Sequence, residues 1–279
     1  MVRFAPFILS LFLLTTSCIT RAEPVPLSTT SLNAIQASGQ FNITMTKGTP
    51  AMDITWPKDF DRNKVTIEQN DSELTLKENC GSFWNFESCP KDPIIVTIKM
   101  SALKNITLHG DSQIAFSGFS NIPHLTLEAF GNSQIKGSAS STNRLSIQAA
   151  GNSLINLAQT SAQNLALVAS GSSDITVSLK SNADKARLDV FGSSRVIGLG
   201  GSLNYLTVKT AGNSFIDFSK VVTQNVILVC TGSNDIALNT AKNGSISGRI
   251  SGTAHIHYKG KPNAVRVTTS GNATISVDS

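Results

Sequence analysis

Two carboxylates at the same position of a repeat of about twenty residues are the first groups in this sequence that could do chemistry. A glycosidase, lyase or calcium site needs at least two carboxylates a few ångströms apart. Asp174 and Asp235 occupy the same position of repeats that are three repeats apart. In a stack of β-strands this separation is about 14 Å. We therefore expect no catalytic pair here, and we interpret Asp174 beside Arg195 and Asp235 beside His255 as surface pairs.

Histidine and serine are the other residue types that could act as ligands or nucleophiles. His255 and His257 alternate along one segment and could face the same side of a strand. Structural zinc takes four ligands, and the sequence places only these two together. Serine recurs after glycine without the strained Gly-x-Ser-x-Gly turn of a hydrolase. The sequence thus predicts no catalytic residue, no cofactor and no metal centre.

A repeat of about twenty residues organises most of the chain and must position these side chains. It starts with Gly-x-Ser-x-Ile or a close variant, and successive glycines are 19 to 21 residues apart. Such spacing is typical of a solenoid, in which each repeat forms one coil. The nine copies are Gly110–Ile114, Gly131–Ile135, Gly151–Ile155, Gly171–Ile175, Gly192–Val196, Gly212–Ile216, Gly232–Ile236, Gly252–Ile256 and Gly271–Ile275.

Apolar residues alternate on both sides of each glycine, as in Leu145, Ile147 and Ala149. A period of two indicates strands with one face turned inward. We predict an all-β, single-domain parallel β-helix, or β-solenoid, with coils of about 20 residues. Right-handed winding is expected because parallel crossovers are usually right-handed. A column of aliphatic side chains would fill its core: Ile114, Ile135, Ile155, Ile175, Val196, Ile216, Ile236, Ile256 and Ile275.

The polar residues beside each glycine have two interpretations. Glycine permits a positive φ at a corner, and a neighbouring serine or asparagine can bond the local backbone. We favour this structural role over a ligand-binding stripe along the rod. Cys230 occupies an inward position that alanine fills in other repeats, so we expect a buried free thiol. The serines of the column are Ser112, Ser133, Ser153, Ser173, Ser194 and Ser214.

Residues 32–100 also alternate, and we expect them to form irregular first coils and an N-terminal cap on the regular coils of residues 101–279. Cys80 and Cys89 bracket an insertion in this segment. In an oxidising compartment this pair would close a disulfide loop. The loop carries the densest aromatic cluster of the chain: Phe83, Trp84 and Phe86. These residues would plug the solenoid or, alternatively, form an exposed surface for a glycan or protein.

Residues 1–22 have the pattern of a secretory signal peptide, followed by an extended leader at 23–31. Arg3 precedes the apolar run Phe4–Leu14, and small residues lead to a cleavage site after Ala22. The run is too short to span a bilayer, which takes about 20 residues. We therefore expect an extracytoplasmic protein without a transmembrane segment.

Cys18 offers an alternative to cleavage after Ala22. The residues before it form a degenerate lipobox, in which Thr15 stands where leucine is preferred. Lipidation at Cys18 would tether the protein to a membrane surface.

Composition restricts the class of partner. Charged residues make up 15% of the chain, and the formal net charge is +5. This weak bias predicts no nucleic-acid partner.

The pattern resembles the GIN domain family, the auto-transporter adhesin head domain of secreted proteins from Gram-negative bacteria. The resemblance covers roughly Leu32 to Ser279 and rests on the strand-like Ile94–Ile98, the repeats, and the endings Ile250–Pro262 and Ser270–Ile275. It implies a β-solenoid fold and an extracytoplasmic location in a Gram-negative-type bacterium. The resemblance supplies no catalytic residues, and the Cys80 to Cys89 loop is outside the family pattern.

Sequence and resemblance together lead to one main functional hypothesis. We expect a non-enzymatic, secreted or envelope-associated solenoid that serves in adhesion, recognition or envelope structure, with a glycan or cell-surface protein as partner. Two alternatives stay open: a carbohydrate-active enzyme, either a polysaccharide lyase or a hydrolase, and self-association through the solenoid ends.

Overall fold

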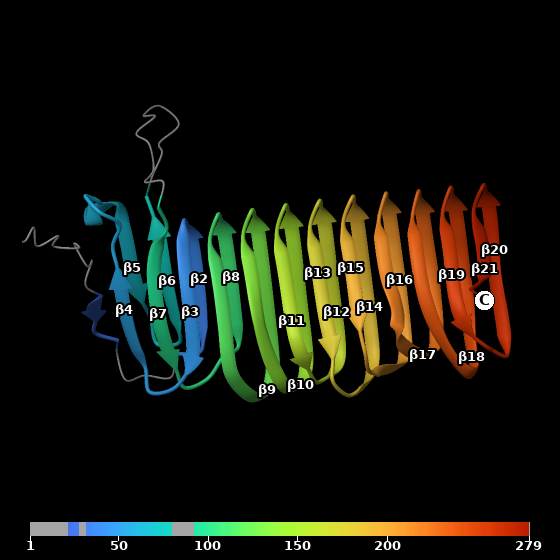
Figure 1. Ribbon diagram of the computed structural model, residues 1–279, viewed down its shortest axis with the longest axis horizontal. Helices are drawn as coiled ribbons and strands as arrows, with labels where there is room; N and C mark the ends of the chain where they lie inside the picture. The colour runs from blue at the N-terminus through green and yellow to red at the C-terminus, as the bar shows by residue number, and fades with distance from the viewer. Residues whose placement is uncertain (1–21, 28–31, 80–91, 279) are drawn as a thin grey trace, which may run out of the picture.

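The computed structural model describes residues 22–27, 32–79 and 92–278, and shows an elongated stack of β-coils (Figure 1). These residues form 21 strands and one short 3-10 turn, η1 (Arg62–Lys64). The strands make one continuous sheet that is wound into two faces, which we name the first and second sheets. The predicted all-β solenoid fold is confirmed, while its handedness stays a prediction.

The first sheet contains the strand that follows each glycine corner. In spatial order its strands are β4 (Ala51–Thr55), β7 (Ile94–Met100), β3 (Phe41–Lys47), the beginnings of β9 (Gln113–Gly131) and β10 (Gln134–Gly151), β11 (Leu154–Thr160), β13 (Asp174–Leu179), β15 (Arg195–Leu199), the beginnings of β17 (Phe215–Gly232) and β18 (Asp235–Gly252), β19 (His255–Gly260) and β21 (Thr274–Val277).

The second sheet contains the strand that leads into the next glycine. Its strands are β5 (Val65–Gln69), β6 (Glu73–Glu78), β2 (Ala34–Gly39), β8 (Asn105–Gly110), the ends of β9 and β10, β12 (Ala162–Gly171), β14 (Asn182–Gly192), β16 (Ser202–Gly212), the ends of β17 and β18, and β20 (Ala264–Gly271).

The predicted aliphatic column is confirmed. Each member is the direct parallel partner of the next, from Ile114 to Ile275. All are buried except Ile275 in the last strand, which is partly exposed. Because every coil covers the aliphatic side chains of its neighbours, the core extends along the whole rod.

The glycine corners have the geometry that the sequence predicts. The repeat glycines adopt positive φ, for example +79° at Gly171. The serine two places later is buried against the corner backbone. Ser173 Oγ lies 3.0 Å from the carbonyl oxygens of both Ala149 and Ser170, and it accepts the Ser170 N–H at 3.1 Å. The serine column therefore stabilises the corners, and we name this side of the rod the glycine edge.

We expect Ser173→Ala to lower the free energy of unfolding by about 1 to 3 kcal/mol, because it leaves buried backbone groups without their hydroxyl partner. Asn152→Ala is the matched control, since the Asn152 side chain bonds Asn132 on the exposed side of the same edge. Its cost should stay within about 0.5 kcal/mol. Urea denaturation followed by circular dichroism measures both, and equal effects would contradict the structural role of the serine.

The N-terminal coils are stacked in an order that differs from the order of the chain. Strands β2 and β3 form a coil between the coil of β6 and β7 on one side and that of β8 and β9 on the other. Outside them, β4 and β5 run antiparallel to β7 and β6, and β1 (Glu23–Val25) pairs antiparallel with β4. Antiparallel strands thus close the N-terminal end.

Side chains fix the beginning of the described chain to this cap. Arg62 and the indole of Trp56 both donate to the Glu23 carboxylate, at 2.6 and 3.1 Å. The Arg62 guanidinium also lies over the Trp56 ring, which stacks on Phe60 at a centroid distance of 5.7 Å. These contacts hold β1 against the outermost coil.

Candidate functional site

Several residues that the sequence analysis selected lie outside the described residues. They are Cys18, Cys80, Phe83, Trp84, Phe86 and Cys89. The disulfide, the aromatic surface and the lipidation site therefore stay predictions.

The predicted surface pairs are confirmed as neighbours on the first sheet. Asp174 and Arg195 are register partners whose Oδ1 and Nε atoms are 3.9 Å apart, and the Arg195 guanidinium also covers the Phe215 ring. Asp235 and His255 are register partners one coil apart. The carboxylates of Asp174 and Asp235 are exposed and lie three coils apart, about 14 Å, so they do not form an acid–base pair.

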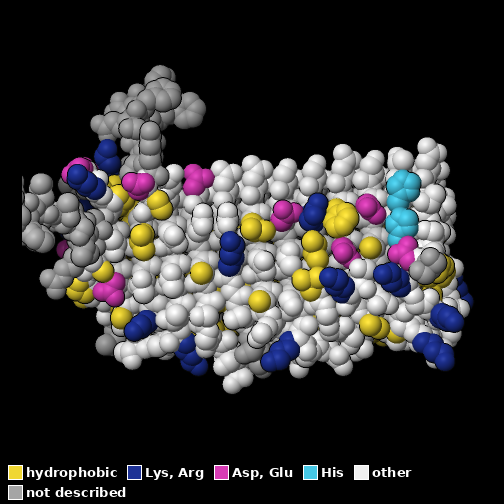
Figure 2. All heavy atoms as spheres, viewed as in Figure 1, with side chains coloured by type: hydrophobic (Ala, Val, Ile, Leu, Met, Phe, Trp, Pro, Cys, Tyr) yellow, Lys and Arg dark blue, Asp and Glu magenta, His cyan; other side chains and the backbone are white. Residues whose placement is uncertain are grey.

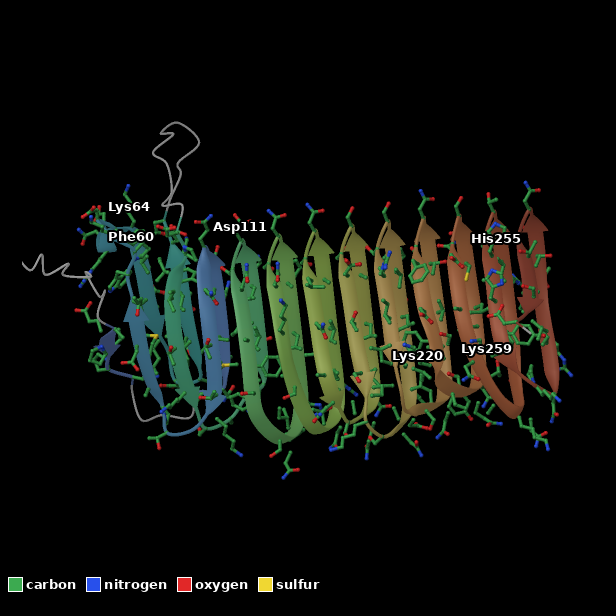
Figure 3. All side chains as sticks on the ribbon, viewed as in Figure 1. Phe60, Lys64, Asp111, Lys220, His255 and Lys259 are labelled. Atoms are coloured by element: carbon green, nitrogen blue, oxygen red, sulfur yellow. The ribbon has the colours of Figure 1, made fainter. Side chains whose placement is uncertain are left out.

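His255 and His257 both project from the first sheet toward the last strand, where His255 is labelled in Figure 3. The Nδ1 atoms lie 3.0 Å from Thr274 Oγ1 and Ser276 Oγ, respectively. His257 Nδ1 is also 3.6 Å from the Asp278 carboxylate. Within the described ranges no group of three or more metal-binding side chains forms.

Cys230 lies in the core of the second sheet with 1% of its surface exposed, and its thiol is free. The predicted buried free thiol is confirmed. Burial raises the pKa of this thiol above its usual value. A raised pKa favours the thiol over the thiolate, so Cys230 reacts slowly with reagents that need a thiolate.

We expect Cys230 in the folded protein to react with iodoacetamide about 100-fold more slowly than in urea, because alkylation requires the coil to open. Peptide mapping by mass spectrometry assigns the label to this residue. Rapid labelling of Cys230 under native conditions would contradict its burial.

The edge opposite the glycine edge carries a row of exposed lysines. Here each coil passes from the first sheet to the second, and we name it the lysine edge. Its exposed charged residues are Lys47, Lys99, Lys104, Lys180, Lys220, Lys242, Lys259 and Lys261. In the regular coils the glycine corners carry no lysine or arginine, and Asp111 is their only charged residue; in the cap, Lys64 and Glu78 lie at this edge (Figure 3). Figure 2 shows basic side chains gathered low on the rod, and Figure 3 places Asp111 at the opposite, upper edge.

Two hollows open on the lysine edge. One, of about 260 Å3, is lined almost entirely by hydroxyl and amide side chains: Thr142, Asn143, Ser161, Ala162, Gln163, Ser181 and Asn182. The other, of about 300 Å3, lies between the cap and the first regular coils. It combines Lys47 and Lys104 with apolar Phe119, Ile122 and Pro123. The lining of the first hollow suits a ligand rich in hydroxyl groups.

Amides and hydroxyls continue along the second sheet beside the lysine edge. Ser202 Oγ donates to Asn182 Oδ1 at 2.7 Å, and Ser245 Oγ donates to Asn225 Oδ1 at 2.9 Å. Tyr205, 48% exposed, lies between Lys185 and Asn225 in adjacent strands. The surface here is a polar strip with one exposed aromatic ring.

The sequence analysis missed this edge, although the signal was present. Lys180, Lys220, Lys242, Lys259 and Lys261 each stand seven to ten residues after a repeat glycine. These lysines stand at the far corner of their coils, away from the position three places after the glycine that Asp174 and Asp235 occupy.

No helix in the described part of the chain has the length and hydrophobicity to cross a membrane.

Comparison with solved structures identifies the same fold in proteins of low sequence identity. A "putative lipid binding protein" from Parabacteroides distasonis is 15% identical, with a TM-score of 0.65 over 92% of this chain and 97% of that chain. A "putative adhesin" from the same species is 18% identical, with a TM-score of 0.63 over 92% and 96%. Another "putative adhesin", from Parabacteroides merdae, is 18% identical, with a TM-score of 0.59 over 93% and 96%. No curated protein matches the chain.

A family profile matches most of the sequence. It covers residues 31–178 and, in a second match, 158–262, and its description is "Putative auto-transporter adhesin, head GIN domain". Both matches span the glycine repeats that form the regular coils. The chain belongs to this GIN domain family.

Proposed function

We propose that the protein is a non-enzymatic, adhesin-like recognition module that binds a surface glycan outside the cytoplasm. The observation that carries this proposal is the lysine edge, where a hollow of hydroxyl and amide side chains continues into a polar strip on a rigid rod. A long flat surface of this kind suits a polymer that makes many weak contacts. The family description, an adhesin head domain, supports the same role.

The arrangement of carboxylates supports binding over catalysis. Asp174, Asp217 and Asp235 are on different coils of the first sheet. Asp217 accepts hydrogen bonds from the backbone and hydroxyl of Ser219, and Asp174 lies beside Arg195. A glycosidase of the usual type needs two carboxyl groups within about 10 Å flanking one bond. Asp174 and Asp235 are three coils apart, about 14 Å, and Asp217, the diagonal neighbour of Asp235 on the adjacent strand, is already held by Ser219.

The proposed location follows from the N-terminal sequence and the family. Residues 1–22 would direct export, with cleavage after Ala22 or lipidation at Cys18. Outside the cytoplasm Cys80 and Cys89 would form a disulfide and present the nearby aromatic side chains. Glu23, the first residue after the proposed cleavage site, is held by Arg62 and Trp56.

A glycan array probed with the chain from Glu23 onward tests the proposal. We expect binding to a restricted set of polysaccharides and no turnover of the bound ligands. A second protein in which Phe83, Trp84 and Phe86 are replaced with serine shows whether the Cys80 to Cys89 loop contributes. Failure of both proteins to bind any glycan on the array, or cleavage of a bound polysaccharide, would overturn the proposed function.

A further inference from the structure

Charge is strongly segregated between the faces of the rod in its last coils, from residue 201 onward. From residue 201 to residue 278 the basic residues are Lys209, Lys220, Lys242, Arg249, Lys259, Lys261 and Arg266. All of these lie on the second sheet or at the lysine edge, where Lys259 stands next to the last residue of the first-sheet strand β19. The three acidic residues of the same span, Asp217, Asp235 and Asp278, are on the first-sheet side. In these last coils the second sheet and the lysine edge therefore carry only basic charged residues.

The lysines of this edge have no acidic partner among the described residues. None of the eight forms an ion pair within 4.0 Å. The nearest carboxylates in sequence have other partners: Asp184 lies 3.8 Å from Lys185 Nζ and accepts from Asn204, while Asp217 accepts from Ser219. Positive charge at this edge is therefore available to an external anion.

The lysines follow one another along the rod, coil after coil, without strict register. Lys220, Lys242 and Lys259 lie at the corners of three successive coils. Neighbouring coils are about 4.8 Å apart. Lys180 precedes Lys220 by two coils, and Lys47 and Lys104 line the hollow near the cap. A linear polymer with regularly spaced negative charges, laid along this edge, could meet all of these ammonium groups.

Other groups on this edge favour a polysaccharide over a lipid surface. The hollow between the two sets of lysines presents amides and hydroxyls, which would hydrogen-bond sugar hydroxyl groups. A protein that binds a bilayer would instead present large apolar side chains beside the lysines. Val222 is exposed at this edge, and Ile227, Val229 and Val265 are exposed on the second sheet. The strip that directly continues the hollow is formed by Asn, Ser and Tyr205.

We propose that the lysine edge binds an anionic polysaccharide, with the polymer aligned along the axis of the rod and its acidic groups paired with the corner lysines. This inference rests on the proposed function and specifies the ligand class and the binding surface. Binding is electrostatic at the lysines and is oriented by the amides and hydroxyls of the hollow between them.

The experiment compares two charge-matched variants of the full mature chain. The edge variant replaces Lys220, Lys242, Lys259 and Lys261 with glutamine. The control variant replaces four exposed lysines away from this edge, Lys58, Lys77, Lys136 and Lys209, with glutamine. Biolayer interferometry measures binding to polygalacturonate, which carries carboxylates, to heparin, which carries sulfates as well, and to neutral dextran. Phosphatidylglycerol vesicles and duplex DNA are the further probes.

We expect the edge variant to bind at least one anionic polysaccharide about 10-fold to 100-fold more weakly than the unchanged protein at 50 mM salt, with a smaller dependence of affinity on salt. The control variant should bind within about threefold of the unchanged protein. Circular dichroism checks that both variants are folded, and the single variants Lys220→Gln and Lys242→Gln replace the edge variant should it misfold.

Three results would overturn the inference. Equal losses in the edge and control variants would assign binding to net charge. Binding to vesicles or DNA at least as strong as to either polysaccharide would assign the edge to a different partner. Binding to a neutral glycan that the edge variant retains would refute the lysine edge as the binding surface, yet leave the proposed function standing.

Discussion

Replacing Ile175 with alanine should lower the free energy of unfolding by about 2 to 5 kcal/mol. Ile175 is fully buried in the middle of the aliphatic column, between its register partners Ile155 and Val196. Removal of three carbons loses their transfer free energy and leaves a cavity that the backbone-bonded coils cannot close. Urea denaturation followed by circular dichroism measures this loss.

Ile275→Ala is the matched control, because Ile275 belongs to the same column but lies partly exposed in the last strand. Its cost should be about 1 kcal/mol or less, since less apolar surface leaves water there on folding. In a solenoid each coil is stabilised mainly by its two neighbours. Equal costs at the two positions would contradict the continuous core.

Gly212→Ala should also destabilise the protein strongly, by about 2 to 4 kcal/mol. Gly212 has a φ of +113°, which side chains rarely adopt. An added Cβ would lie 2.6 Å from the carbonyl oxygen of Gly192, the glycine of the preceding coil. Relief of this contact requires two coils to separate at the corner, where their backbones bond each other. The midpoint of urea denaturation reports the effect.

Two further glycines separate the causes of this loss. Gly118→Ala introduces a side chain at a φ of +82°, but its Cβ would meet ordinary contacts at 3.6 Å. Gly48→Ala has neither a left-handed backbone nor a close contact, with its nearest atom at 3.5 Å. We expect a cost of about 1 kcal/mol for Gly118→Ala and little or none for Gly48→Ala. A cost for Gly48→Ala as large as that for Gly212→Ala would refute the steric explanation.

The regular coils could be predicted because each determinant is local in the sequence. The isoleucine at the fourth place after each glycine predicts the inward face, and the constant spacing predicts the register. The serine column follows in the same way, since Ser133 and Ser173 bond carbonyl oxygens of the corner at which they stand. Twenty-residue periodicity therefore contains nearly all the information needed for this part of the fold.

The stacking order of the cap could not be predicted by the same argument. Alternation in Phe41–Lys47 and in Ile94–Met100 predicts strands and their buried faces, but any such strand can pair with any other. The structure pairs β3 with both β7 and β9. Partner choice depends on which apolar faces fit together across many residues, and no periodic signal records that choice.

The candidate site at the lysine edge was not predicted from the sequence. The sequence selected Phe83, Trp84 and Phe86 as a binding surface, and because these residues lie outside the described ones, that surface stays a prediction. No sequence motif accompanies the corner lysines and distinguishes them from other exposed lysines. Their grouping emerges only when the coils are stacked, because Lys220 and Lys242 then lie on neighbouring coils at the same edge.

The position of the β2 and β3 coil has a consequence for the order of assembly during synthesis. Ser112 Oγ donates to the Gly39 carbonyl at 2.8 Å, and Glu78 accepts the Gln40 N–H. Both neighbouring coils contain strands that come later in the chain, so the ribosome synthesises the β2 and β3 coil before either neighbour is complete. Each regular coil, in contrast, is synthesised after the coil on which it stacks. The regular coils can be added one at a time in the order of synthesis. The β2 and β3 coil is complete at Lys47, but its second neighbour is completed only by β9, which begins at Gln113, more than sixty residues later.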